Sequence, residues 1–351
     1  MRWYAFLLYP FALLYDLFTR LRNLFFDLGW LKSVSSPIPS IVVGNLSVGG
    51  TGKTPMVEFL IRMLRNERRL ATLSRGYGRK TKGFLTATSQ VFPEEIGDEP
   101  FQIYQKFGKE ISVFVGEDRV KALKGIASKS DVPELIILDD AFQHRYVNGD
   151  LNILLTTHQK PFFSDFLLPM GRLRESRIGA KRADVIIITK CPEDLNISEK
   201  TSFASQVTPY SRPNTLVLFS SISYGKPEPL LISLFFSPKI ILLTGLANDQ
   251  PLIDYVSEKY DLLEVLSYPD HHDYSEVDFD KVRSIYKQHV TENPVVLTTE
   301  KDAVKVKSKA PKGFLEEIPI FVLPIEVRFS PADELALAQQ IQQKVFKKDN
   351  I

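Results

Sequence analysis

A lysine and a threonine at the end of a glycine-rich segment are the strongest chemical signal in the sequence. Gly49, Gly50 and Gly52 lie just before Lys53 and Thr54. Backbone N–H groups of such glycines can curl around phosphates, and a following helix adds its positive end. The lysine then reaches the β- and γ-phosphates, and the threonine hydroxyl ligates Mg²⁺. The residues predicted to bind the phosphates are Ser47, Val48, Gly49, Gly50, Thr51, Gly52, Lys53 and Thr54.

The elements around this segment are those that a phosphate-binding loop requires. A β-branched run at 41–43 predicts a buried strand before the glycines. Apolar residues then recur at helical spacing from Val57 to Leu64, with Pro55 in the first turn, where its missing N–H costs nothing. Strand, glycine loop and helix indicate a P-loop. Ser47 stands where the strict pattern has glycine, and the alternative is a glycine-rich tight turn.

Two aspartates supply a second half of the nucleotide site. Asp139 and Asp140 follow the apolar run 135–138, which predicts a buried strand that delivers carboxylates at its end. P-loop proteins hold their metal ion in this way. Many strands end in an aspartate, so the pair alone is weak evidence for a metal site. The glycine loop earlier in the chain strengthens this interpretation. We expect one of the two carboxylates to bind the metal ion and the other to support it. The sequence does not indicate which residue has which role.

Further strand-like runs predict the fold class. They occupy 70–74, 111–115, 151–155 and 185–189, between helical stretches, which indicates a doubly wound, mostly parallel α/β sheet. Proline and serine cluster between 205 and 240, which marks a boundary or an extended connection. New strand patterns at 240–246 and 294–299 predict a second, smaller α/β domain. We therefore expect an N-terminal helix at 1–32, a P-loop core at 33–210 and a smaller C-terminal domain at 211–351.

The first 32 residues differ from the rest of the chain. They hold ten aromatic residues, which include both tryptophans of the chain. The uncharged run from Trp3 to Tyr15 is too short to span a bilayer, and no cleavage site follows it. Asp16, Arg20, Asn23 and Asp27 then form a polar stripe opposite Leu17, Leu21, Leu24 and Leu28. The pattern predicts a helix that lies in the membrane interface; the alternative is a helix packed on its own domain.

Composition excludes other classes. The formal net charge is +2, which gives no electrostatic case for nucleic acid. Cys191 is the only cysteine, so a disulfide scaffold is excluded.

Seven further motifs follow the glycine loop in a fixed order. They are Ser74-Arg75-Gly76-Tyr77-Gly78-Arg79, Gly97-Asp98-Glu99-Pro100, Val115-Gly116-Glu117-Asp118-Arg119, Asp139-Asp140-Ala141-Phe142-Gln143-His144, Leu168-Pro169-Met170-Gly171-Arg172-Leu173-Arg174-Glu175, Asp270-His271-His272-Asp273-Tyr274 and Thr299-Glu300-Lys301-Asp302-Ala303-Val304-Lys305. Together with the aromatic N-terminus, the chain resembles the tetraacyldisaccharide 4′-kinases of lipid A biosynthesis from its start to about residue 305. Two positions depart from the family pattern: Ala141 replaces a glycine, and Arg172 replaces a proline.

The resemblance implies a reaction and a location. ATP would donate its γ-phosphoryl group to the 4′-hydroxyl of a tetraacylated glucosamine disaccharide 1-phosphate, with Mg²⁺ as cofactor. The partners would be this lipid and the membrane surface, with no nucleic acid and no obligate protein partner. The enzyme would lie on the cytoplasmic face of the inner membrane of a Gram-negative bacterium. Because an acylated disaccharide stays in the membrane, the aromatic helix would bring the enzyme to it.

The resemblance also implies roles for single residues. Asp98 and His271 would form the dyad that accepts the proton of the sugar hydroxyl; from the residues alone, Asp98 could equally be a helix N-cap and His271 part of a polar loop. Arg119 and Arg174 would stabilise phosphate charge, with Lys53. Glu175 would join Thr54, Asp139 and Asp140 around the metal ion, although Arg174-Glu175 alone suggests a surface ion pair.

Two other functions compete with the lipid kinase. A membrane-associated P-loop switch ATPase would regulate a partner protein, but Val48 stands where the related partitioning ATPases carry a signature lysine. A soluble small-molecule kinase would use the N-terminal helix only for packing.

Overall fold

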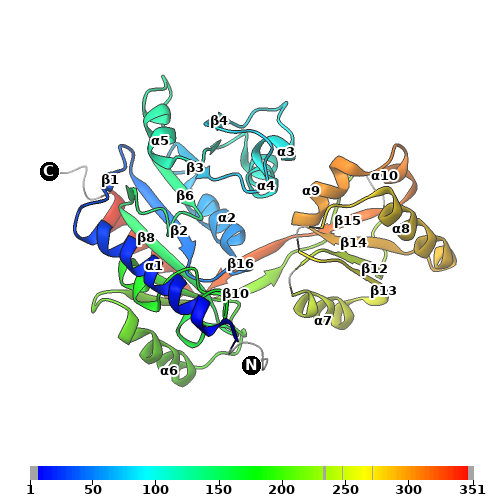
Figure 1. Ribbon diagram of the computed structural model, residues 1–351. Helices are drawn as coiled ribbons and strands as arrows, with labels where there is room; N and C mark the ends of the chain where they lie inside the picture. The colour runs from blue at the N-terminus through cyan, green and yellow to red at the C-terminus, as the bar shows by residue number, and fades with distance from the viewer. Residues whose placement is uncertain (1–6, 232–234, 247, 271, 347–351) are drawn as a thin grey trace.

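The structure is a computed structural model that describes residues 7–231, 235–246, 248–270 and 272–346. Two sheets of different size organise these residues (Figure 1). The larger sheet carries the glycine loop, and the smaller one lies beyond a narrow connection. The chain is thus a mixed α/β protein with mostly parallel sheets, as the sequence predicts.

The large sheet has nine strands, and the glycine loop follows its central strand β2. In spatial order the strands are β16 (Ile325–Phe329), β10 (Leu216–Tyr224), β9 (Val185–Thr189), β8 (Leu151–Thr157), β2 (Ser40–Asn45), β6 (Leu135–Asp139), β3 (Leu70–Ser74), β5 (Ser112–Val115) and β4 (Leu85–Thr86). All neighbours are parallel except the pair at each edge, β16 with β10 and β4 with β5. Carboxyl ends of the parallel strands therefore meet at one edge, where ligands bind in open α/β sheets.

Helices cover both faces of this sheet because its central strands are apolar on both sides. One core includes Ile41 and Val43 and receives α2 (Lys53–Leu64), α4 (Asp98–Phe107) and α11 (Pro331–Ile341). The opposite core includes Val42 and receives α5 (Arg119–Ala127), the 3₁₀ segment Arg177–Arg182 and α6 (Ile197–Val207). The large domain also has the short helix α3 (Pro93–Ile96) and a small parallel pair of β1 (Val34–Ser35) with β7 (Val147–Asn148).

The small sheet has five strands and its own two cores. Their order is β11 (Glu228–Pro229), β15 (Ile320–Leu323), β14 (Val295–Thr299), β12 (Lys239–Thr244) and β13 (Asp261–Ser267). Helix α7 (Gln250–Lys259) covers one face. Helices α8 (Glu276–Gln288), α9 (Glu300–Lys309) and α10 (Phe314–Glu317) cover the other.

The connection between the sheets differs from the predicted boundary at residue 211. Strand β10 belongs to the large sheet and leads out of it, and β16 returns as its antiparallel partner (Figure 1). Helix α11 then packs Leu337 and Ile341 into the large core. The small domain is therefore inserted between β10 and β16, and the last residues described belong to the large domain. The sequence marks the connection by its prolines but does not reveal a pairing between strands a hundred residues apart.

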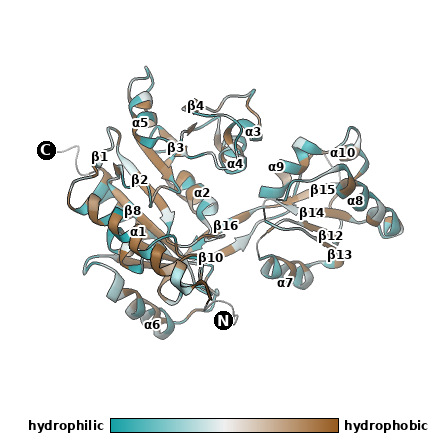
Figure 2. Cartoon of the chain, in the orientation of Figure 1, coloured by the Kyte–Doolittle hydropathy of each residue, from teal (hydrophilic) through white to brown (hydrophobic). Residues whose placement is uncertain are grey.

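Helix α1 (Tyr9–Asp27) lies on the large domain through a mixed face, on which Ala12 and Phe26 are buried and polar side chains make hydrogen bonds. Arg22 donates to the carbonyl of Gln143 at 3.0 Å, and Asn23 donates to Glu175 at 3.0 Å. Its apolar side is exposed, including Leu14, Leu17, Phe18, Leu21 and Leu24 (Figure 2). This is the reverse of a helix packed by its apolar stripe. Among the described residues no helix has the length and apolarity needed to cross a membrane.

Candidate active site

The glycine loop joins β2 to α2 and is shaped from inside by a residue that sequence reasoning missed. Asn45, the last residue of β2, is fully buried. Its Nδ2 donates to the Ser47 carbonyl at 2.6 Å and to Thr51 Oγ1 at 2.9 Å. Gly52, at φ 82°, then turns the chain into α2, which begins at Lys53. The available signal was a polar side chain where a buried strand meets a glycine loop.

The Arg172–Glu175 segment borders this loop. Val48 N donates to the Arg172 carbonyl at 2.8 Å, and Arg174 N donates to the Leu46 carbonyl at 2.7 Å. The Arg172 side chain instead pairs with Asp165 at 2.8 Å. The glycine loop and the Arg172–Glu175 segment are therefore joined by backbone hydrogen bonds. The Arg172 side chain stabilises its own loop through Asp165.

Three charged groups that the sequence predicted for the site come together at the end of β6. The Lys53 Nζ lies 3.7 Å from Asp140 Oδ1. Arg174 NH1 donates to both oxygens of Asp140, at 3.1 and 3.2 Å. Burial raises the pKa of Asp140, but Lys53 and Arg174 outweigh it, so the pKa lies below its ordinary value. Two cations and an ionised carboxylate thus meet beside the glycine loop.

Asp139 is the buried member of the acidic pair. Its Oδ1 receives no hydrogen bond from the described residues. Burial, together with the charges of Glu99 and Asp140, raises its pKa to about 7. A divalent cation would supply the missing partner for this oxygen, so the donor set fits Mg²⁺, which takes few protein ligands and completes its shell with phosphate and water. No cluster of three or more potential metal ligands occurs in the described ranges.

Arg119 lies behind this pair. The side chain is buried and donates to the Gly116 carbonyl at 2.9 Å and to the Asp139 carbonyl at 3.2 Å. Burial lowers its pKa to about 10, so it stays charged at neutral pH. Its guanidinium therefore holds two backbone carbonyls together, that of Gly116 just after β5 and that of Asp139 at the end of β6.

Glu175 is occupied by protein donors. Arg182 binds both of its oxygens, at 2.7 and 2.9 Å. Asn23 of α1 and Gln143 add hydrogen bonds at 3.0 and 3.2 Å. This carboxylate joins α1 to the site and has little capacity left for a cation. We therefore leave Glu175 out of the metal site that we propose below.

Asp98 is the first residue of α4, and its side chain does not cap that helix. Its Oδ2 lies 3.5 Å from the Lys305 Nζ of α9, in the small domain. Gly97 before it has φ 93°, and a Cβ there would lie 2.8 Å from the Tyr77 carbonyl, so this approach requires glycine. His271 lies outside the described residues. Lys305 belongs to the Thr299–Lys305 motif, and the sequence could not reveal its role because its partner, Asp98, is about two hundred residues away.

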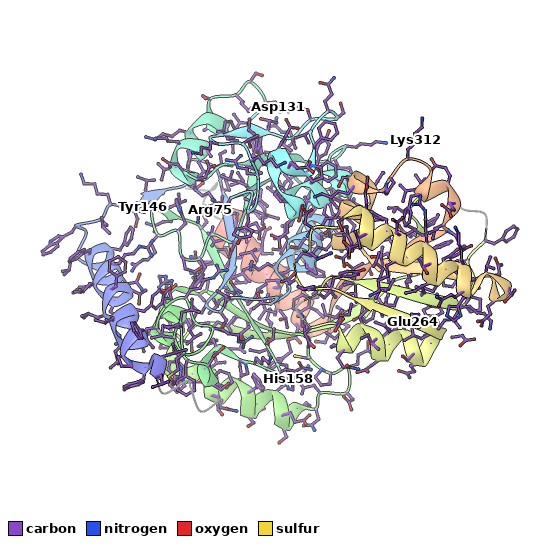
Figure 3. All side chains as sticks on the ribbon, turned by 45° about the vertical axis from the view of Figure 1, so that its right-hand side comes forward. Arg75, Asp131, Tyr146, His158, Glu264 and Lys312 are labelled. Atoms are coloured by element: carbon purple, nitrogen blue, oxygen red, sulfur yellow. The ribbon has the colours of Figure 1, made fainter. Side chains whose placement is uncertain are left out.

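A hollow of about 420 Å³ opens on the large domain beside the start of α5. Its lining residues are Glu117, Asp118, Val120, His144 and Tyr146. The Tyr146 ring packs edge-on against Phe26, near the C-terminal end of α1, with the ring centroids 5.0 Å apart. One wall of the hollow therefore contacts that helix. Burial, with the positive charges of Arg119, Arg22 and Arg75, lowers the pKa of His144 to about 4. Arg75 and Tyr146 project onto the same part of the large domain in the view of Figure 3.

Comparisons with known proteins agree along the whole chain. The family model of tetraacyldisaccharide-1-P 4′-kinase, LpxK, matches residues 4–345. The tetraacyldisaccharide 4′-kinase of Flavobacterium johnsoniae is 42% identical over 319 residues, which cover 90% of this chain and 91% of the relative. That of Cytophaga hutchinsonii is 38% identical over 351 residues, covering 98% and 97%. A crystal structure of LpxK from Aquifex aeolicus in complex with ATP has a TM-score of 0.74 at 30% identity, covering 97% of this chain and 99% of that one.

Proposed function

This chain belongs to the tetraacyldisaccharide 4′-kinase family, and from that premise we propose how its residues carry out the reaction. It is an ATP-dependent kinase of lipid A biosynthesis, which phosphorylates the 4′-hydroxyl of tetraacyldisaccharide 1-phosphate. Phosphoryl transfer requires in-line positioning and neutralisation of charge more than covalent chemistry. The reaction therefore needs side chains that hold the phosphates, side chains that hold the metal ion and a group that accepts the proton.

The meeting of Lys53, Asp140 and Arg174 at the glycine loop carries this proposal. Residues 47–54 bind the phosphates through backbone N–H groups, and Lys53 reaches the β- and γ-phosphates. Arg174 adds positive charge on the same side. Thr54, Asp139 and Asp140 would hold Mg²⁺, which when bound neutralises charge on the β- and γ-oxygens. The unpartnered oxygen of Asp139 supports this assignment.

Asp98 accepts the proton of the attacking sugar hydroxyl, with His271 as its partner. The Asp98 side chain is partly exposed at the start of α4, where an acceptor could reach it. Glu99, the next residue, is close enough to raise the pKa of Asp139, so the start of α4 faces the acidic pair. The base and the phosphate site therefore lie within one region. We propose that the small domain closes on this region when ATP binds.

We propose that the exposed apolar side of α1 binds a membrane surface. Large apolar side chains that face outward along a whole helix are typical of interfacial helices. The polar side of α1 meets Glu175 and Gln143, which border the site, so the membrane surface would lie next to the reaction centre. The acyl chains of the substrate would stay in the lipid while its sugar enters the hollow beside His144. We propose a peripheral enzyme on the cytoplasmic face of the inner membrane of a Gram-negative bacterium, where ATP is available.

Steady-state kinetics with the lipid in detergent micelles tests the residue roles. Lys53→Ala should lower kcat by about 10²- to 10³-fold, the usual loss when a group that stabilises transition-state charge is removed. Asp98→Ala should lower kcat by about 10²- to 10⁴-fold with ATP binding retained. His271→Ala should likewise depress turnover more than ATP affinity. Lys307→Ala, an exposed lysine of α9, is the matched control and should behave as the wild type. Full activity in Lys53→Ala or Asp98→Ala would overturn that residue's assignment.

A further inference from the structure

Helix α9 of the small domain carries a buried lysine that reaches into the large domain. Only 9% of the Lys305 side chain is exposed, and its Nζ lies 3.5 Å from Asp98 Oδ2. The same Nζ donates to the His272 carbonyl at 3.0 Å. A buried ammonium is costly unless it is paired and hydrogen-bonded, and both of these partners come from places that matter to the reaction. One is the proposed base, and the other is the backbone next to His271.

A second ionic contact fixes α9 against α4. Glu300, the first residue of α9, pairs with Lys106 near the end of α4. Lys106 also lies 2.6 Å from the buried Glu58 of α2, the helix that follows the glycine loop. The other oxygen of Glu300 accepts from Ile325 N at 3.2 Å, where the chain returns through β16. These contacts connect α9 to the nucleotide-binding helix and to the connection between the domains.

The two ion pairs define the packing of the helices. Lys106 lies late in α4 and pairs with the start of α9, whereas Asp98 lies first in α4 and pairs with a later residue of α9. The helices are therefore antiparallel at this contact, and sliding one along the other would break both pairs. The position of Asp98 relative to the small domain is thus fixed at two points.

The ion pair also orients the carboxylate. Lys305 engages Oδ2 of Asp98, and none of the described residues donates a hydrogen bond to Oδ1. A carboxylate held through one oxygen presents the other in a defined direction, which is what a general base requires. Because Lys305 also donates to the His272 carbonyl, the same ammonium group ties the Asp98 carboxylate to the backbone of the small domain.

We propose that Lys305 is a positioning residue: it aligns the Asp98 carboxylate for proton acceptance while the small domain is docked on α4. The inference rests on the proposed role of Asp98 as proton acceptor. Lys305 itself does not touch the reacting atoms. Its removal should therefore disturb turnover and leave nucleotide binding at the glycine loop intact.

Two substitutions at one position, with a control on the same helix, test this role. Lys305→Met keeps the volume of the side chain and removes its charge, Lys305→Arg keeps the charge, and Lys307→Met removes an exposed charge nearby. Misplacement of a reacting group by about 1 Å can cost about 10²-fold in rate. We expect kcat of Lys305→Met to fall about 10- to 100-fold with the KM for ATP within about twofold. Lys305→Arg should recover most of kcat, and Lys307→Met should match the wild type.

The outcomes separate this inference from the role of Asp98. Wild-type kcat in Lys305→Met would overturn the positioning role alone, provided that Asp98→Asn is inactive. If Lys305→Met loses thermal stability, or kcat and ATP affinity fall together without recovery in Lys305→Arg, the lysine is merely structural. An active Asp98→Asn would overturn the base assignment itself, and the inference with it. In the double variant, Lys305→Met should add little to the loss caused by Asp98→Asn, because there is no base left to align.

Discussion

The orientation of α1 gives the most demanding prediction, because it sets membrane binding against folding. Leu14 and Phe18 lie one turn apart on the exposed side, with 65% and 69% of their surface accessible. Burying a leucine or phenylalanine fully stabilises by about 1.5–3 kcal/mol, so these two should contribute about 2–4 kcal/mol to membrane binding. The double substitution Leu14→Ser/Phe18→Ser should therefore weaken binding by about 30-fold to several hundred-fold.

Sedimentation with phosphatidylethanolamine–phosphatidylglycerol vesicles measures this loss. Leu335→Ser/Val277→Ser is the matched control, since both residues are exposed apolar residues on other helices, α11 and α8. The control should bind vesicles as the wild type does, and both double variants should unfold near the wild-type temperature. Vesicle binding by Leu14→Ser/Phe18→Ser within twofold of the wild type would refute the membrane role of α1. A fall of many degrees in its melting temperature would show that these side chains pack on protein.

Three further predictions concern the site. Glu175→Ala should destabilise the fold by about 1–3 kcal/mol in chemical denaturation, because it removes a buried carboxylate that accepts hydrogen bonds from Arg182, Asn23 and Gln143; a stable variant with weakened Mg²⁺ dependence would instead restore Glu175 as a metal ligand. Asn45→Ala should weaken ATP binding measured by calorimetry, by about 1–3 kcal/mol, because the buried hydrogen bonds that shape the loop are lost; unchanged affinity would show that the loop keeps its form without them. Burial, with Arg119 next, lowers the pKa of His144 to about 4, so the neutral ring stabilises the fold above pH 6.5 and this contribution is lost as the pH falls towards 4. His144→Gln should flatten stability between these values in pH-dependent unfolding, and identical slopes would contradict the shift.

Local patterns were sufficient to predict the strands and the succession of strand, glycine loop and helix at 40–64. The apolar runs at 135–138 and 185–189 form β6 and β9, because a buried parallel strand needs only a short β-branched stretch. The spacing of Lys53 and Thr54 after the glycines is a property of one continuous segment. Asp140 directly follows β6, and Arg174 reaches it because the backbone of Arg172 and Arg174 is hydrogen-bonded to the loop after β2.

Contacts between distant segments of the chain could not be predicted from the sequence. Helical periodicity predicted both stripes of α1 but not which of them meets the protein, since that depends on Glu175 and Gln143 far along the chain. Glu175 has the chemistry of a metal ligand, and the sequence could not reveal the four protein N–H groups that its carboxylate accepts from. The pairing of β10 with β16, and of Asp98 with Lys305, likewise joins residues that no local pattern connects.

The transfer of label from [γ-³²P]ATP to tetraacyldisaccharide 1-phosphate in micelles tests the central claim most directly. The purified protein with Mg²⁺ should label the lipid at its 4′ position, and Lys53→Ala and Asp98→Ala should not, although Asp98→Ala still binds ATP. ATP binding by the wild type without any labelled lipid would contradict the account. Label on the lipid in both variants would contradict its placement of the reaction at this site.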